Sequence, residues 1–164
     1  MHQRVKNQIE MLRLMKRKIG FTCSCFDLLH AGHYLMLKDS KAQCDVLVVG
    51  LQTDPTIDEK YRLATDGKNK NMPIQDYKER KIQIEGCKYV DYVLEYSTEQ
   101  DLYEILKELN PDVRILGTDW KDKEYTGHDL EIHIHWHIRD HDYSTSNLRK
   151  RVFETELEKK NKLE

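Results

Sequence analysis

Short apolar runs alternate along the chain with segments in which apolar residues recur at helical spacing. The run Val46-Leu47-Val48-Val49 is apolar at consecutive positions, as a central parallel strand covered on both faces should be. Strands that alternate with helices are typical of βαβ units and a parallel sheet. The pattern predicts strands at 18–24, 45–51, 90–95, 112–117 and 131–138, and helices at 32–43, 75–86, 99–109 and from 145 onward. We therefore expect an α/β fold: a single Rossmann-like domain with a five-stranded, mostly parallel sheet and helices on both faces.

Two segments flank this alternation. Residues 3–17 precede the first predicted strand and are expected to be helical, because Val5, Ile9 and Leu12 share one face. What this segment does is left open by the sequence. The predicted organisation is a helical N-terminal extension at 1–17, a domain at 18–152 and a helical C-terminal tail at 153–164.

The longest connection without a helical or strand pattern runs from residue 52 to 73. It contains four basic residues: Lys60, Arg62, Lys68 and Lys70. Connections of this length are usually lids, binding loops or solvated segments. Two interpretations remain open, a basic flap that closes over phosphates or a surface loop with ordinary lysines.

Composition narrows the class of protein. The chain has 164 residues, of which 34% are charged, and a net charge of −2, so a basic nucleic-acid-binding face is not indicated. No apolar stretch has the length of a membrane span, and no signal peptide is visible. The four cysteines form no CxxC pair, which favours reduced, structural thiols. We expect a cytoplasmic protein that binds no nucleic acid and does not span a membrane.

Candidate chemistry is concentrated in the segment Phe26-Asp27-Leu28-Leu29-His30-Ala31-Gly32-His33, where the first predicted strand ends and a helix begins. The first turn of a helix presents unpaired N–H groups and a partial positive charge, which favour phosphate. His30 and His33 add donors that can carry positive charge near neutral pH, and Gly32 lets the backbone come close to a ligand. These residues predict a site for a polyphosphate.

The pattern His30-Ala31-Gly32-His33 after a strand resembles the HxGH nucleotidyltransferase superfamily and, within it, the cytidylyltransferase family, closest to the glycerol-3-phosphate cytidylyltransferase type. The likeness runs from residue 18 to 152. Its further motifs are Ser24-Cys25-Phe26-Asp27, Thr53-Asp54, Lys60-Tyr61-Arg62, Glu79-Arg80-Lys81, Lys88-Tyr89-Val90-Asp91-Tyr92-Val93, Gly117-Thr118-Asp119-Trp120 and the segment 139–146.

The resemblance implies an enzyme that transfers CMP from CTP to a phosphorylated small alcohol, such as glycerol 3-phosphate, and releases pyrophosphate. It also implies Mg²⁺ with CTP, and a homodimer. The catalytic residues expected from it are His30, His33, Lys60 and Arg139. The nucleotide-binding residues expected from it are Cys25, Phe26, Asp27, Gly32, Arg62, Lys88, Asp91, Gly117, Asp119, Ser144 and Thr145.

A second branch of the superfamily, the heptose-phosphate adenylyltransferases, is also similar. The shared segments are Cys25-Phe26-Asp27, the HxGH motif, Pro111-Asp112-Val113 and Ser144-Thr145-Ser146-Asn147. This branch would use ATP and a sugar phosphate. CTP is favoured because Tyr89-Val90-Asp91, Trp120 and the Lys60/Arg62 pair look more like the cytidylyl group. A third alternative is a non-catalytic nucleotide-binding protein, because Ser24, Cys25, Lys88, Thr118 and Asp142 depart from the family pattern.

Two groups of residues fall outside the family pattern. Asp140 and Asp142 replace part of a short turn before the Ser-Thr pair, and we expect them to contact hydroxyls of the acceptor. His133, His135 and His137 alternate along the last predicted strand and would share one face. They are either the more solvated face of that strand or, less simply, a transition-metal site. No metal ligand of the protein is assigned.

Overall fold

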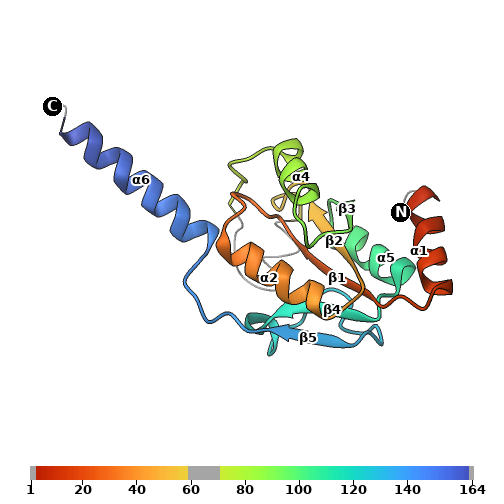
Figure 1. Ribbon diagram of the computed structural model, residues 1–164. Helices are drawn as coiled ribbons and strands as arrows, with labels where there is room; N and C mark the ends of the chain where they lie inside the picture. Colours follow the sequence, from red (N-terminus) through yellow and green to blue (C-terminus); the bar gives the residue numbers. More distant parts are fainter. Residues whose placement is uncertain (1–2, 59–70, 163–164) are drawn as a thin grey trace.

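The centre of the molecule is one sheet of five strands, seen in the computed structural model, which describes residues 3–58 and 71–162 (Figure 1). The strands are β1 (Ile19–Ser24), β2 (Val46–Gln52), β3 (Tyr92–Tyr96), β4 (Val113–Gly117) and β5 (Ile134–His137). Their order is β3-β2-β1-β4-β5, and every neighbouring pair is parallel. The predicted Rossmann-like α/β fold is confirmed. The order reverses direction between β1 and β4, and ligands of such sheets bind at the carboxyl ends of strands beside this switch point.

Helices cover both faces of the sheet. They are α1 (Gln3–Leu14), α2 (Ala31–Ala42), α4 (Tyr77–Glu85), α5 (Glu99–Leu109) and α6 (Thr145–Asn161), with a 3-10 turn, η1 (Thr118–Trp120). One face of the sheet packs against α2 and α4 through Leu37 and Ile84, and the other packs against α5. The sheet is therefore buried on both sides, which explains why all residues of β2 are buried.

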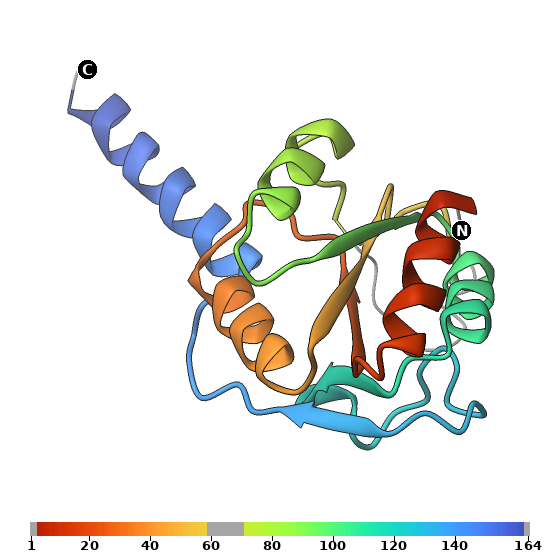
Figure 2. The same cartoon turned by 45° about the vertical axis from the view of Figure 1, so that its right-hand side comes forward.

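Helix α1 lies beside α5 and belongs to the packed body of the protein (Figure 2). Ile9 is buried in the same core cluster as the apolar residues of α5. The guanidinium of Arg13 donates to the carbonyl oxygens of Leu109 (2.5 Å) and Asn110 (2.6 Å). These carbonyls lie at the C-terminal end of α5, where no intrahelical donor remains. The N-terminal extension thus covers the α5 face and caps its helix.

Helix α6 is different, because it extends away from the rest of the molecule and contains no buried residue (Figure 1). The helix is continuous from Thr145 to Asn161, so the domain boundary expected at residue 152 lies inside it. Its first turn contacts the candidate site described below. In the described part of the chain, no helix is both long and apolar enough to cross a bilayer.

The expectation that the three histidines around β5 form its solvated face is wrong. His137 is buried, and its Nδ1 lies 2.7 Å from Oδ2 of Asp39 on α2. His135 Nε2 lies 3.1 Å from the same oxygen, whereas His133 precedes the strand and is exposed. His135 and His137 lie on the face of β5 that α2 covers, where both contact Asp39. A half-buried carboxylate needs such hydrogen-bond donors. Among the described residues, no group of three His, Cys, Asp or Glu side chains is placed to hold a metal ion.

Candidate active site

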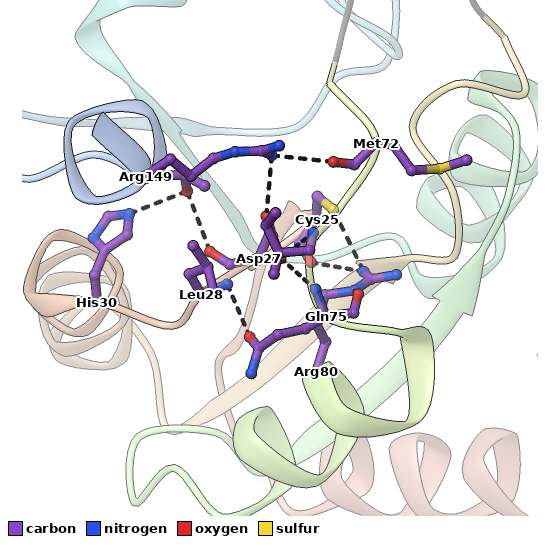
Figure 3. Close-up of polar contacts among 10 residues, drawn as sticks. Cys25, Asp27, Leu28, His30, Met72, Gln75, Arg80 and Arg149 are labelled. Atoms are coloured by element: carbon purple, nitrogen blue, oxygen red, sulfur yellow. Dashed lines mark hydrogen bonds and ion pairs between the residues drawn. The ribbon is translucent and has the colours of Figure 1, made fainter. Parts of the chain in front are cut away.

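The turn between β1 and α2 is held in an unusual conformation. Phe26 and Leu28 have positive φ values of 51° and 48°, which residues other than glycine rarely adopt. Asp27 fixes the turn, because its buried Oδ1 accepts hydrogen bonds from the backbone N–H groups of Ile74 and Gln75, each at 3.0 Å (Figure 3). The Gln75 side chain in turn accepts from the N–H of Leu28 (2.9 Å). Strained turns that are fixed in this way occur mainly at functional sites.

His30 and His33 follow this turn and form a stacked pair, with ring centroids 3.8 Å apart and 22° between the planes. His30 is the N-cap of α2, and its Nδ1 accepts from the N–H of Gly32 (3.1 Å). Nδ1 of His33 accepts from the N–H of His30 (3.4 Å). Because both Nδ1 atoms are acceptors, each neutral ring carries its proton on Nε2. Both rings therefore present a donor beside the first turn of α2.

The first turn of α6 meets this histidine pair. Ser144 is the N-cap of α6 and accepts from the N–H of Asn147 (3.1 Å). The Thr145 hydroxyl donates to the carbonyl oxygen of Asp27 (3.2 Å) and lies 3.3 Å from Nε2 of His30 (Figure 3). His30 Nε2 thus donates a hydrogen bond to the Thr145 hydroxyl, and this hydroxyl donates to the carbonyl oxygen of Asp27. The amino ends of two helices converge here, and both favour an anion.

The histidine pair is electrically neutral in the free protein. Burial, followed by the charges of His30 and Arg139, lowers the pKa of His33 to about 3. Burial also lowers the pKa of His30, followed by the charges of Arg139 and His141. A bound phosphate would oppose these effects, because a nearby anion favours the charged imidazole. The site is therefore prepared to donate hydrogen bonds to an anion without being charged beforehand.

This depressed pKa predicts a stability change with pH. Between pH 3 and 6.5, the unfolded chain binds a proton on His33 that the folded chain does not, so stability should fall as pH falls through this range. Replacing His33 with glutamine removes this contribution. We expect the melting temperature of His33→Gln to fall less than that of the wild type between these two pH values. His133→Gln, which changes an exposed histidine, is the matched control, and an equal fall in all three proteins would contradict the neutral buried His33.

Gly32 is needed for the segment before α6 to pack on this turn. A Cβ atom at Gly32 would lie 2.8 Å from the carbonyl oxygen of Tyr143 and 3.0 Å from Cε1 of His141. Both ring nitrogens of His141 are buried without a hydrogen-bond partner in the described part of the chain. Asp140 and Asp142, which flank His141, are exposed, and their contact with an acceptor stays a prediction.

Several of the remaining predicted residues also lie at the carboxyl ends of the strands. A Cβ atom at Gly117 would contact Asp119 and lie 3.9 Å from Cδ of Arg139, so these three lie together after β4. Phe26 is buried in the core beneath the turn. The carbonyl oxygen of Cys25 accepts a hydrogen bond from Arg80 (2.8 Å).

Asp91 does not join the histidine site. Asp91 lies at the amino ends of β2 and β3, where its Oδ2 accepts from the N–H of Leu47 (2.7 Å) and from Nζ of Lys41 (2.5 Å). This carboxylate therefore lies at the amino ends of the strands, whereas the histidines lie at the carboxyl ends. Lys88 lies in the same connection between α4 and β3, with Nζ 5.1 Å from the Tyr89 ring centroid, and it lines a groove together with Ala31 and Tyr143. Lys60 and Arg62 lie outside the described residues, so the predicted flap stays a prediction.

Two arginines contribute to the site without having been expected there. Arg80 is only 1% exposed and donates to backbone carbonyls at the carboxyl ends of β1 and β2. Arg149 on α6 lies 3.7 Å from Oδ2 of Asp27 and donates to the carbonyl of Met72 (3.1 Å; Figure 3). The Glu79-Arg80-Lys81 match pointed to the region of Arg80, but in sequence both arginines look like ordinary charges on the surface of a helix.

A parallel sheet with a histidine pair at a helix N-terminus, beside the switch point, defines a nucleotidyltransferase of the HxGH superfamily. The chain belongs to the cytidylyltransferase-like family, whose family model matches residues 21–151. The closer likeness to the glycerol-3-phosphate type is not confirmed by the relatives that the comparisons find.

Two of these relatives are bifunctional proteins named HldE. The chain is 40% identical over 114 residues to the bifunctional protein HldE of Wolinella succinogenes, covering 70% of this chain and 22% of that protein. It is 34% identical over 147 residues to the bifunctional protein HldE of Helicobacter pylori, covering 90% of this chain and 30% of that protein. The chain therefore spans less than a third of the length of these curated relatives.

Solved structures agree on the fold. A lipopolysaccharide core biosynthesis protein from Thermoplasma volcanium superposes with a TM-score of 0.56 at 28% identity, covering 78% of this chain and 99% of that one. A pantoate-beta-alanine ligase from Francisella tularensis, solved with beta-gamma ATP and beta-alanine, gives a TM-score of 0.57 at 19% identity, covering 88% of this chain and 70% of that one. The second likeness concerns the fold alone.

Proposed function

We propose that the chain is an adenylyltransferase that transfers AMP from ATP to a heptose-like sugar phosphate and releases pyrophosphate. The observation that carries the phosphate chemistry is the stacked His30/His33 pair where α2 and α6 converge. The choice of ATP and a sugar phosphate rests on the relatives named HldE and on the lipopolysaccharide core biosynthesis protein. It also fits the motifs shared with the heptose-phosphate adenylyltransferases.

The placement of residues weakens the argument for CTP. Asp91 supports the amino ends of the strands and does not reach the histidine pair. It belongs to the motif that favoured the cytidylyl group. The glycerol-3-phosphate cytidylyltransferase reading is kept as the alternative, since the matching family model is cytidylyltransferase-like.

The mechanism follows from where donors lie. An oxygen of the acceptor phosphate attacks the α-phosphorus of the nucleotide, a new P–O bond forms, and the bond to pyrophosphate breaks. His30 and His33 donate from Nε2 to the α-phosphate oxygens and stabilise the charge that develops there. For this, His30 exchanges Thr145 for a phosphate oxygen as its acceptor. Arg139 and the first turn of α6 contact the triphosphate from the other side. No nucleophile from the protein is required.

Mg²⁺ and a homodimer belong to the proposal. Oδ1 of Asp27 is occupied by two backbone N–H groups, and its Oδ2 lies 3.7 Å from Arg149, so Asp27 is not placed as a direct metal ligand. The donor set fits an ion held mainly by the nucleotide, which is how Mg²⁺ commonly binds with triphosphates. When bound, Mg²⁺ would neutralise phosphate charge.

The nucleotide is tested by thermal stability. ATP with Mg²⁺ should raise the melting temperature more than CTP at equal concentration, because stabilisation grows with the ratio of ligand concentration to Kd and reaches about 2.7 kcal/mol at 100 Kd. ATP should also release pyrophosphate when heptose 1-phosphate is added. A larger shift with CTP would favour the cytidylyl reaction, and binding of both substrates without pyrophosphate release would indicate a non-catalytic binding protein.

A further inference from the structure

A polar cluster joins helix α2 to strand β5. Asp39 on α2 is its centre, because Oδ2 of this carboxylate lies 2.7 Å from Nδ1 of His137 and 3.1 Å from Nε2 of His135. His137 is only 7% exposed, and its Nε2 is buried without a hydrogen-bond partner in the described part of the chain. The proton of the neutral His137 ring therefore lies on Nδ1, where Asp39 accepts it. Burial alone would raise the pKa of Asp39, but the hydrogen bonds from His137 and His135 lower it below its ordinary value, so the carboxylate is ionised at neutral pH.

Strand β5 contacts α2 through this cluster rather than through an apolar core. β5 is the edge strand of the sheet and pairs with β4 on one side only (Figure 1). Among the described residues, none of 134–137 belongs to either apolar core cluster. Hydrogen bonds to a carboxylate are roughly twice as strong as those between neutral groups. The Asp39 bonds therefore fix the place of His137, the last residue of β5, which is in register with Gly117 at the end of β4.

The end of β5 determines where Arg139 lies. Arg139 follows His137 by two residues, in the segment between β5 and α6 that has no regular structure. Its Cδ lies 3.9 Å from the position of a Cβ atom on Gly117. Burial lowers the pKa of His30, and the charge of Arg139 is the next largest cause, so the guanidinium lies near the histidine pair. One helix, α2, thus carries both the histidines and the carboxylate that holds the strand leading to Arg139.

We propose that Asp39, His135 and His137 are positioning residues, which hold Arg139 at the distance from the histidine pair that the triphosphate requires. They act through the end of β5 and do not contact the substrate themselves. A misplacement of about 1 Å caused far from the reacting atoms can lower the rate by about 100-fold, so a fixed strand end matters for the reaction. The inference rests on the proposed function, because the contact between Arg139 and the triphosphate belongs to that proposal.

His137→Leu tests the position of Arg139 by kinetics, because leucine removes the donor to Asp39. The KM for ATP should rise about tenfold, as for one lost hydrogen bond to a charged group, while the KM for heptose 1-phosphate stays within about twofold. His137→Asn is the rescue variant: its amide N–H can take the place of Nδ1–H, so its KM for ATP should stay within about threefold of the wild type. His133→Leu makes the same change as His137→Leu at an exposed histidine and should alter neither KM.

The pKa of His30, measured by NMR titration of the free protein, tests the same position without turnover. The charged or titratable groups that face this ring are Arg139 and His141 on the segment after β5 and His33 on α2. Asp39→Leu should raise the pKa of His30, because Arg139 moves away from the ring. Loss of a carboxylate by itself would only lower the pKa of an imidazole, so the sign of the change separates the two effects. In the Arg139→Gln background, Asp39→Leu should add no further rise.

An unchanged or lowered pKa of His30 in Asp39→Leu would overturn the assignment, as would a rise that persists in the Arg139→Gln background. An unchanged KM for ATP in folded His137→Leu would overturn it as well. The two proposals fail separately. A wild type that releases no pyrophosphate from ATP and heptose 1-phosphate would refute the reaction, whereas the titration of His30 in the free protein still decides whether Asp39 positions Arg139.

Discussion

His30→Ala and His33→Ala should each lower turnover by at least about 100-fold, the usual effect of losing one preorganised donor at a developing charge. Each ring presents its Nε2 proton beside the first turn of α2, and each Nδ1 is already occupied by a backbone N–H. The two rings are stacked, so removal of one also removes the support of the other. Turnover is measured as pyrophosphate release with ATP and heptose 1-phosphate at saturating concentrations.

His30 has a second role that the experiment must separate from catalysis. As the N-cap of α2, it stabilises the helix, and alanine at such a position costs about 1 kcal/mol. His30→Asn keeps an N-cap acceptor and loses the Nε2 donor, so its stability should stay near that of the wild type while its turnover falls like that of His30→Ala. His133→Ala changes an exposed histidine and is the control for removing an imidazole. Near-normal turnover in folded His30→Ala and His33→Ala would refute the proposed mechanism.

The elements that the sequence predicts well are those whose signal is local. Strand β2 is apolar at consecutive positions, and a strand buried on both faces requires that pattern. The junction at His30 is also local, because a strand, a turn and a helix start follow one another within a few residues. The order of the strands is not local. It depends on which strands pair across the switch point, and no residue of β4 signals that β1 will be its neighbour.

The misplaced residues share one cause: their partners are distant in sequence. Asp91 belongs to a motif that resembles a nucleotide-binding one, but its carboxylate pairs with Lys41 and the N–H of Leu47 at the other edge. His137 alternates as a solvated residue would, and only Asp39 on α2 explains its burial. Periodicity shows which residues share a face of an element, whereas it cannot show which groups that face will meet.

Arg80→Met should destabilise the fold by about 3–5 kcal/mol, because several carbonyl acceptors lose a charged donor together and each unsatisfied buried acceptor costs about 1–3 kcal/mol. Four backbone carbonyls accept hydrogen bonds from this one side chain: Cys25 (2.8 Å), Gln52 (2.7 Å), Thr53 (2.5 Å) and Gln75 (3.1 Å). Three of these carbonyls lie where β1 and β2 end, and that of Gln75 lies just before α4. Removal of the guanidinium leaves these buried and partly buried acceptors unpaired, which costs more than the net contribution of a hydrogen bond.

Urea unfolding at neutral pH measures this loss, and two further variants show its origin. Arg80→Lys keeps the positive charge but lacks the planar fork, so it should lose part of the stability. Lys81→Met is the control on the same helix: its side chain is 44% exposed and its ion pair with Glu85 spans 3.8 Å, and such surface pairs contribute about 0–1 kcal/mol. If Arg80→Met costs no more than Lys81→Met, water must satisfy the carbonyls. Because Arg80 also binds Cys25 and Gln75 beside the motif turn, folded Arg80→Lys should turn over more slowly as well, linking the stability of the sheet edge to the geometry of the histidine pair.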